Sequence, residues 1–219
     1  MGASMLRYAY AAALIGLIPA MASAQLVTNG GFEAPVITGP CCNTAPPDPL
    51  PGWVATPNVN VVNGTFMSTN GNLAFQGNQY LDLVGQGGTG SISQDLTLIP
   101  GETYNLSFAF SHNLFDPAEA TSASASFTID GLTGTLFHDT GDTNNLDWRI
   151  FSGEFVATGA DTLNFTNLTG GPNEGILLDA VSVTQLPEPA TWGMMLLGFG
   201  VIGFAMRRNR KRAALPQFA

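Results

Sequence analysis

Positive charge is almost missing from the long middle of this sequence. Of the seven lysines and arginines among 219 residues, only Arg149 lies between residues 25 and 206, whereas all 16 acidic residues lie between Glu33 and Glu188. The segment 25–206 therefore has a formal net charge of −15, from one basic and 16 acidic residues. Such a segment repels phosphate backbones and offers no counterion release, which argues against nucleic acid as a partner.

Cysteine and charged residues of either sign are also scarce. The two cysteines, Cys41 and Cys42, are adjacent and cannot join distant parts of the chain. A bridge between them, a disulfide to another chain and free thiols all stay open. Only 11% of the residues are charged, while there are 26 glycines and 14 prolines, a balance typical of one turn-rich β domain.

A continuous apolar run of about 20 residues, the length of a membrane span, is missing from the N-terminus. Arg7 precedes a shorter apolar run at residues 8–18, and small residues follow at Ala22, Ser23 and Ala24. This order of charge, apolar core and small residues is typical of a secretory signal peptide. We expect a signal helix over residues 1–24 that signal peptidase removes after Ala24.

Residues 186–219 combine a Pro-Glu-Pro motif, an apolar stretch and a basic cluster. The 15 residues 192–206 would form a helix of about 22 Å, shorter than the roughly 30 Å hydrocarbon core, and snorkelling basic side chains can cover the difference. The pattern predicts a transmembrane helix whose basic end stays in the cytoplasm. The basic residues of this membrane stop are Arg207, Arg208, Arg210, Lys211 and Arg212.

The order of motif, short glycine-containing helix and arginine cluster resembles the PEP-CTERM sorting signal of Gram-negative bacteria that make exopolysaccharide. The resemblance implies that an exosortase, a membrane cysteine peptidase, recognises Pro187, Glu188 and Pro189 and removes the helix. It also implies export across the inner membrane to the cell surface or to an extracellular, biofilm-like matrix.

Apolar and polar residues alternate repeatedly within residues 25–185. In segment 103–110, Tyr104, Leu106, Phe108 and Phe110 share one face, and segment 122–129 shows the same period. Because no helical pattern of 10 to 15 residues intervenes, we predict an all-β antiparallel sandwich, a jelly roll. Further strands are expected at 54–62, 80–84, 91–98, 132–137, 148–156, 163–168 and 176–184.

A glycine pattern at Gly85, Gly87 and Gly90 fits the spacing of a dinucleotide-binding loop. That function requires a helix at the third glycine, yet a β-type alternation follows and Pro100 closes it. We therefore expect a hairpin loop there and no nucleotide cofactor.

Several short strings, in order along residues 26–184, resemble those of galactose-binding-like jelly rolls, in particular the choice-of-anchor extracellular proteins and a related plant cell-wall domain. The strings are VTNGGFE at 27–33, PGW at 51–53, YLDL at 80–83, ISQ at 92–94, PGETY at 100–104 and LDAVSV at 178–183. The resemblance implies that the first and last strands meet.

The same resemblance implies a structural Ca²⁺ ion where those strands meet. Glu33 and Asp179 match the ligand carboxylates, and Asn29 with main-chain oxygens could complete the six to eight ligands that calcium takes. The alternative is that the two carboxylates only cap turns. Ala180 stands where the family pattern has Asn or Asp, a departure beside the proposed site.

Two other polar groups suggest no metal site. The loop with Asp139, Asp142 and Asp147 lacks the glycine and the distal glutamate of an EF-hand, so we interpret it as a solvated loop. The only histidines, His112 and His138, lack partners at metal-ligand spacing, and we predict that both lie on the surface.

Sugar recognition needs an aromatic ring to cover a pyranose face and polar groups for the hydroxyls. Trp53, Tyr80 and Trp148 are the candidate rings, with core packing as the alternative for each. We expect no enzyme, because motifs such as G-x-S-x-G and H-E-x-x-H are missing. A non-catalytic module that contacts extracellular polysaccharide is favoured; the alternatives are an adhesive protein without sugar affinity and a polysaccharide-acting enzyme.

Overall fold

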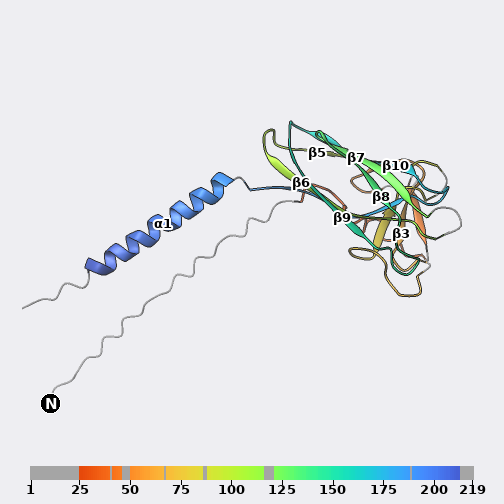
Figure 1. Ribbon diagram of the computed structural model, residues 1–219, viewed down its shortest axis with the longest axis horizontal. Coiled ribbons are helices and arrows are strands. Elements are labelled where there is room, and N and C mark those ends of the chain that lie inside the picture. Colours follow the sequence, from red (N-terminus) through yellow and green to blue (C-terminus); the bar gives the residue numbers. More distant parts are fainter. Residues whose placement is uncertain are drawn as a thin grey trace, which may run out of the picture.

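The computed structural model describes residues 25–39, 41–45, 50–66, 68–85, 88–115, 121–187 and 189–212. Two antiparallel sheets face each other in a sandwich, and one helix, α1 (Pro189–Arg212), follows the last strand (Figure 1). The expected signal helix at 1–24 and Glu188 of the sorting motif lie outside the described residues. The predicted all-β jelly roll is confirmed.

The two sheets have six and five strands, and each pair of hydrogen-bonded neighbours is antiparallel. In the six-stranded sheet the order is β1 (Cys42–Ala45), β3 (Val59–Asn63), β4 (Gln79–Asp82), β11 (Ile176–Gln185), β6 (Thr103–His112) and β9 (Arg149–Val156). In the five-stranded sheet it is β2 (Val54–Ala55), β5 (Ser91–Leu96), β10 (Asp161–Thr169), β7 (Ala123–Ile129) and β8 (Leu132–His138).

The alternation predicted for the strands places their apolar faces in the sandwich core. Leu106 and Phe108 of β6 are at most 1% exposed, and the Phe108 ring centroid lies 5.4 Å from that of Phe127 in β7 and 5.0 Å from that of Phe165 in β10. These contacts join the two sheets. Burying each such ring contributes about 1.5–3 kcal/mol to stability.

A second, smaller core covers the opposite face of the six-stranded sheet. Side chains alternate along β4, so Leu81 faces the sandwich interior while Tyr80 and Asp82 face the other way. Loop residues Leu73 and Leu146 pack over Tyr80 on that face. The outer face of the sheet is therefore partly covered by loops, which can hold a pocket against the strands.

The first residues of the sandwich meet the last strand, as predicted. Gln25 forms a bridge with Thr184, and the Leu26 N–H donates to the Val183 carbonyl at 3.1 Å. Further along, the Val181 N–H donates to the Gly30 carbonyl at 2.8 Å. The segment with Asn29 and Glu33 is thereby held against the middle of β11.

Three predictions about local structure were wrong. The single strand expected at 54–62 is two strands in different sheets, β2 and β3, separated at Pro57, which lacks an N–H for a ladder. Strand β1 was missed because its four residues, CNTA, show no apolar alternation. The loop after β4 connects the two sheets, so it does not close a hairpin.

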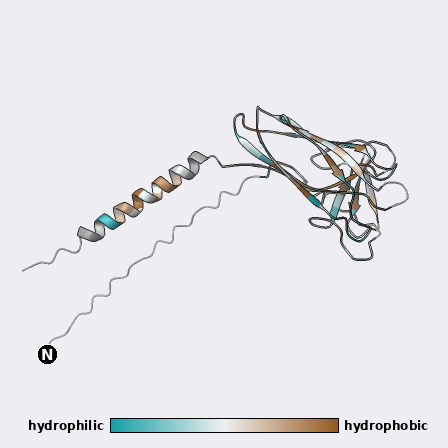
Figure 2. Cartoon of the chain, in the orientation of Figure 1, coloured by the Kyte–Doolittle hydropathy of each residue, from teal (hydrophilic) through white to brown (hydrophobic). Residues whose placement is uncertain are grey.

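Helix α1 carries apolar side chains along its middle and basic residues toward its end (Figure 2). Leu196 and Phe204 are 72% and 70% exposed. In the part of the chain that the structure describes, no helix is both long enough and apolar enough to cross a membrane. The helix predicted at 192–206 is present within α1, and its crossing of a membrane stays a prediction.

Candidate functional site

The aromatic rings considered as sugar platforms are mostly part of the cores. Trp53 is 7% exposed and packs on Phe32, with ring centroids 5.7 Å apart, and Tyr80 is fully buried. Neither ring has a free face, so the platform hypothesis is wrong for both and the core alternative holds. Trp148 is half-buried; its ring lies edge-on to Tyr80, and its Nε1 donates to the Leu73 carbonyl at 2.8 Å.

The structure brings Glu33 and Asp179 together, as the calcium prediction requires. Glu33 Oε1 accepts N–H bonds from Asn78 at 2.7 Å and Gln79 at 3.0 Å, and Asp179 Oδ2 accepts one from Gln76 at 2.9 Å. Burial, more than the repulsion from Glu33, raises the pKa of Asp179 to about 7. A cation between the two carboxylates would offset this repulsion.

Oxygen-bearing side chains gather around Gly31, where the calcium ion was expected. A methyl group built on Gly31 would lie 3.9 Å from Asp179 Oδ1, from Gln76 Oε1 and from Glu33 Cγ, so three oxygen-bearing side chains surround this residue. Gln76 was missed by the sequence analysis. Asn29 instead closes its own turn, with Oδ1 accepting from the Ala34 N–H at 3.1 Å, although a carbonyl oxygen retains a second lone pair.

Within the described ranges, no group of three or more His, Cys, Asp or Glu residues could hold a metal ion. A calcium ion at Gly31 would therefore need amide and main-chain oxygens besides the two carboxylates.

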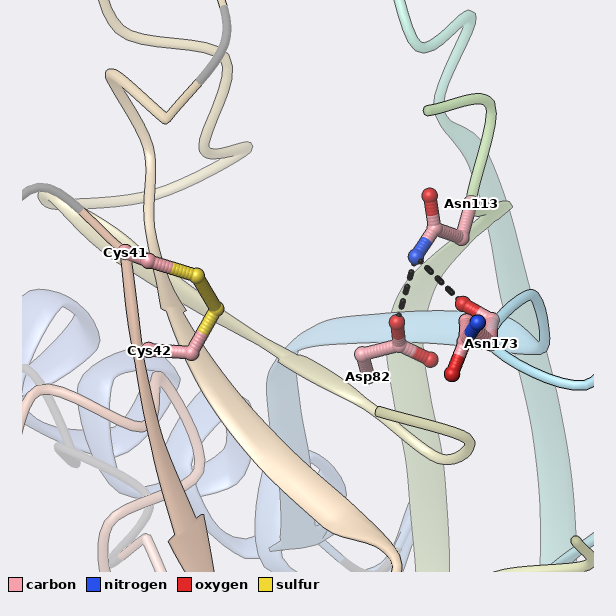
Figure 3. The surroundings of a disulfide bond; sticks show 5 residues. All are labelled: Cys41, Cys42, Asp82, Asn113 and Asn173. Atoms are coloured by element: carbon pink, nitrogen blue, oxygen red, sulfur yellow. Dashed lines mark hydrogen bonds between the residues drawn. A yellow bond between two sulfur atoms is a disulfide. The ribbon is translucent and has the colours of Figure 1, made fainter. Parts of the chain in front are cut away.

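A pocket of about 300 Å³ opens on the outer face of the six-stranded sheet. Its lining includes the disulfide between Cys41 and Cys42 and the apolar side chains of Val62, Phe66 and Phe115. The polar side chains of Asn60, Asp82, Asn113 and Asn173 also line it. Figure 3 shows the two sulfur atoms on one side and the Asp82–Asn113 pair on the other.

Asp82 is the central polar group of this pocket. Its Oδ1 accepts from the Val84 N–H at 2.8 Å, and its Oδ2 accepts from Asn113 Nδ2 at 2.7 Å. Burial raises the pKa of this carboxyl to about 7; the two hydrogen bonds lower it, and nearby Glu174 raises it further. Asp82 therefore changes between hydrogen-bond donor and acceptor near neutral pH.

Asn60 adds an unused acceptor to the same pocket. Its side chain is 5% exposed, and Oδ1 has no hydrogen-bond partner among the residues that the structure describes. An unpaired buried amide oxygen costs about 1–3 kcal/mol, which a ligand hydroxyl could recover. The sequence held one signal for this site, since Asp82 interrupts the otherwise apolar string Tyr-Leu-Asp-Leu-Val, where a charged residue is unusual.

His112 and His138 form a buried pair between the two sheets, which corrects their prediction as surface residues. Their Nδ1 atoms are 2.7 Å apart, and His138 Nε2 lies 2.9 Å from the Asp147 carbonyl. That carbonyl requires Nε2–H on His138, so the proton between the two rings belongs to His112. Burial lowers the pKa of both, that of His112 to about 4, so both rings are neutral at pH 7.

A second hollow, of about 390 Å³, lies beside Glu33 and is lined by Asn63, Thr65, Asn72 and other residues. Asn63 Oδ1 already accepts from the Thr65 N–H at 2.9 Å, and Asn72 Nδ2 donates to the Gly77 carbonyl at 2.7 Å. These polar groups already bond within their own loops, so fewer of them remain for a ligand than in the pocket at Asp82.

Solved structures with carbohydrate-binding folds are similar to this chain. The structure of TmCBM61 in complex with beta-1,4-galactotriose is 18% identical, with a TM-score of 0.49, over 75% of this chain and 100% of that one. The CBM22-1 xylan-binding domain from Paenibacillus barcinonensis Xyn10C is 22% identical, with a TM-score of 0.40, over 63% and 87%. Likeness at this level carries no argument about a ligand. None of the curated proteins compared with this chain matches it significantly.

The sandwich and the C-terminal segment together define an exported, surface-sorted all-β protein. Residues 185–211 match the PEP-CTERM protein-sorting motif, which confirms that resemblance and indicates exosortase processing. Residues 25–184 match the family described as "Protein of unknown function (DUF642)", and because this match covers most of the chain, the chain belongs to that family.

Proposed function

We propose that this chain is a non-catalytic module that contacts extracellular polysaccharide through the pocket at Asp82, after exosortase processing at the cell surface or in the surrounding matrix. The observation that carries the proposal is the pocket itself, which combines apolar side chains with the polar groups of Asp82, Asn113 and Asn60. A sugar ring presents the same two kinds of surface, C–H faces and hydroxyl edges. The sorting motif supports the location.

Charge favours a carbohydrate over other extracellular ligands. The pocket is lined by a carboxylate and three asparagines and, among the described residues, by no lysine or arginine. Carboxylates and carboxamides are suited to exchanging hydrogen bonds with hydroxyl groups, whereas anionic ligands need cations. A volume of about 300 Å³ is at the lower end for ligand sites and suits one or two sugar rings.

Affinity electrophoresis of the chain purified after export tests this proposal. We expect gels that contain the producing organism's own exopolysaccharide to retard the wild type. The affinity of Asp82→Ala, obtained from its migration at several polymer concentrations, should be at least tenfold lower. Thr65→Ala, in the second hollow, is the matched control and should migrate as the wild type does. No retardation of any variant would support the adhesive alternative, and release of reducing sugar would support an enzyme.

We also propose that one structural Ca²⁺ ion binds where the segment 29–33 meets the middle of β11, at Asp179. Glu33, Asp179 and Gln76 would hold it, with main-chain oxygens completing the set, as their arrangement around Gly31 supports. The ion would fix the first segment against the last strand and has no part in sugar contact.

A further inference from the structure

The disulfide between Cys41 and Cys42 occupies a place where it contributes little to the stability of the fold. A disulfide stabilises a protein mainly by closing a loop in the unfolded chain, and the effect grows with the length of that loop. Here the sequence separation is one residue, so the closed loop is as short as it can be. Stabilisation of the fold by cross-linking therefore does not explain why the disulfide lies at this position.

The position of the disulfide in the pocket supplies another explanation. Cys42 begins β1 and pairs with Val62 of β3, so both cysteines stand at the edge of the sheet and line the pocket opposite Asp82. The rings of Phe66 and Phe115 line the same pocket and lie edge-to-face with centroids 4.9 Å apart. Two linked, polarisable sulfur atoms thus add to a lining that already contains two aromatic rings.

Resting on the proposed function, we propose that the oxidised Cys41–Cys42 pair is the surface on which one neutral sugar ring packs, while Asp82, Asn113 and Asn60 hydrogen-bond its hydroxyls. The C–H face of a pyranose meets the sulfur atoms, as it would meet an aromatic platform in other sites. In this arrangement the site needs no aromatic platform, and Trp53 and Tyr80 are both buried in the cores.

The polar lining selects against acidic sugars. Asp82 is the acidic residue in the pocket lining, and no lysine or arginine among the described residues lines the pocket to neutralise an anionic ligand. A uronic acid, sulfate or phosphate group placed there would be repelled, and burial strengthens the repulsion. A hydroxyl group, in contrast, can donate to the Asn60 oxygen and exchange hydrogen bonds with Asp82 in either of its protonation states.

The test uses affinity electrophoresis of the exported full chain against neutral galactan, xylan and β-glucan and against acidic polygalacturonate. We expect at least one neutral polymer to retard the wild type and polygalacturonate not to do so. The Cys41→Ser/Cys42→Ser variant should lose at least tenfold in affinity for that neutral polymer, with its melting temperature within about 2 °C of the wild type, because the closed loop is so short.

Reduction of the wild type with a phosphine provides a second readout that needs no substitution. It should weaken retardation as the double substitution does, whereas the double variant should be insensitive to the same treatment. Equal binding by oxidised, reduced and substituted protein would overturn the role of the disulfide and leave the proposed function standing. Retardation by polygalacturonate would overturn the selection for neutral sugars. Failure of the wild type to bind any of these polymers or the producing organism's own exopolysaccharide would overturn the proposed function and this inference together.

Discussion

At the scale of single residues, this protein buries several ionisable side chains whose protonation states are set by their surroundings. Asp82 and the pair of His112 and His138 are each at most 1% exposed, and their pKa values are shifted in opposite directions. The free energy of unfolding should therefore depend on pH, and substituting one group at a time should show how much each group contributes.

Asp82 should make the folded protein less stable as pH rises toward neutrality. Its pKa rises from an ordinary 3.8 to about 7, so between these values the folded chain binds the proton that the unfolded chain has released. The free energy of unfolding should fall from about pH 4 to pH 7 and then level off. In melting curves, Asp82→Asn should flatten this part of the profile, whereas Asp95→Asn, at an exposed site, should not. Parallel profiles for the wild type and Asp82→Asn would contradict the assignment.

The histidine pair should act in the opposite direction. The unfolded histidines take up protons near pH 6.5, while the folded His112, with a pKa of about 4, does not. Stability should thus decrease as pH falls from about 6.5 to 4. His112→Gln keeps a donor toward His138 and should show a smaller loss of melting temperature over this range. An unchanged loss would mean that other groups cause the acid sensitivity.

Removal of calcium should lower the melting temperature. A ligand present at 100 times its dissociation constant stabilises the folded state by about 2.7 kcal/mol, which corresponds to several degrees in a domain of this size. Dialysis against EDTA, followed by return of Ca²⁺, should lower and then restore the midpoint. Asp179→Asn should respond to neither step. A wild-type midpoint that ignores EDTA would remove the metal from the description.

At the scale of strands and turns, the tightest constraint is the contact between the first segment and the last strand. A methyl group on Gly30 would lie 1.9 Å from the carbonyl oxygen of Val181 in β11. Two heavy atoms cannot approach this closely. Gly30→Ala must therefore push the two segments apart, at a cost of about 1–3 kcal/mol or more.

Thermal melting measures this cost. Gly30→Ala should lower the midpoint by several degrees, since one kcal/mol corresponds to about 2–4 °C in domains of 150–250 residues. Gly159→Ala is the matched control, because a methyl group there meets no heavy atom within 4 Å among the described residues. Equal midpoints for both variants would show that the first segment is not held as the structure places it.

The strands could be predicted where one face alone is buried, because burial then imposes a period of two. This is why β6 and β7 were found almost to the residue. The same reasoning failed for β1, which has four mostly polar residues, and for the segment that Pro57 divides. Periodicity tells which face a residue shares, but not which sheet its strand joins.

The pocket could not be predicted, because its walls come from positions far apart in the sequence. Cys42 and Asp82 reach the same pocket through the ladders from β1 to β3 and from β3 to β4. The two histidines were misassigned for a related reason: each lies at the end of a strand in a different sheet, and only the packing of the sheets buries them. The proximity of Glu33 and Asp179 could be predicted because the family strings placed them together, and calcium binding there stays a prediction.

At the scale of the whole molecule, the sandwich and the sorting segment are joined in one chain with opposite charges. The middle of the sequence carries a formal net charge of −15, and its lone basic residue, Arg149, pairs with Asp139 at 3.0 Å. The positive charges of α1 are concentrated in its last turns. This separation suits a chain whose basic end is recognised apart from the exported domain.

Substitution of the sorting motif should separate processing from folding. In a host with an exosortase, a tag placed just before Leu186 should report a mature form that has lost the mass of α1. Replacing Pro187, Glu188 and Pro189 with alanine should preserve the full mass and leave the melting temperature of the sandwich unchanged. Release of the variant at the mature mass would show that another peptidase cuts the chain.

Strand β1 lies at the edge of its sheet, with β3 as its neighbour, and the sulfur atoms stand at its beginning. An edge strand of four residues is held by fewer hydrogen bonds than the central strands and can open locally while the core stays folded. A sugar ring bound between the disulfide and Asp82 would contact both β1, at the edge of the sheet, and β4, nearer to its centre. Binding of the proposed sugar to the closed form and local opening of β1 are then thermodynamically linked, so a change that opens β1 lowers the apparent affinity in proportion to the closed fraction that is lost.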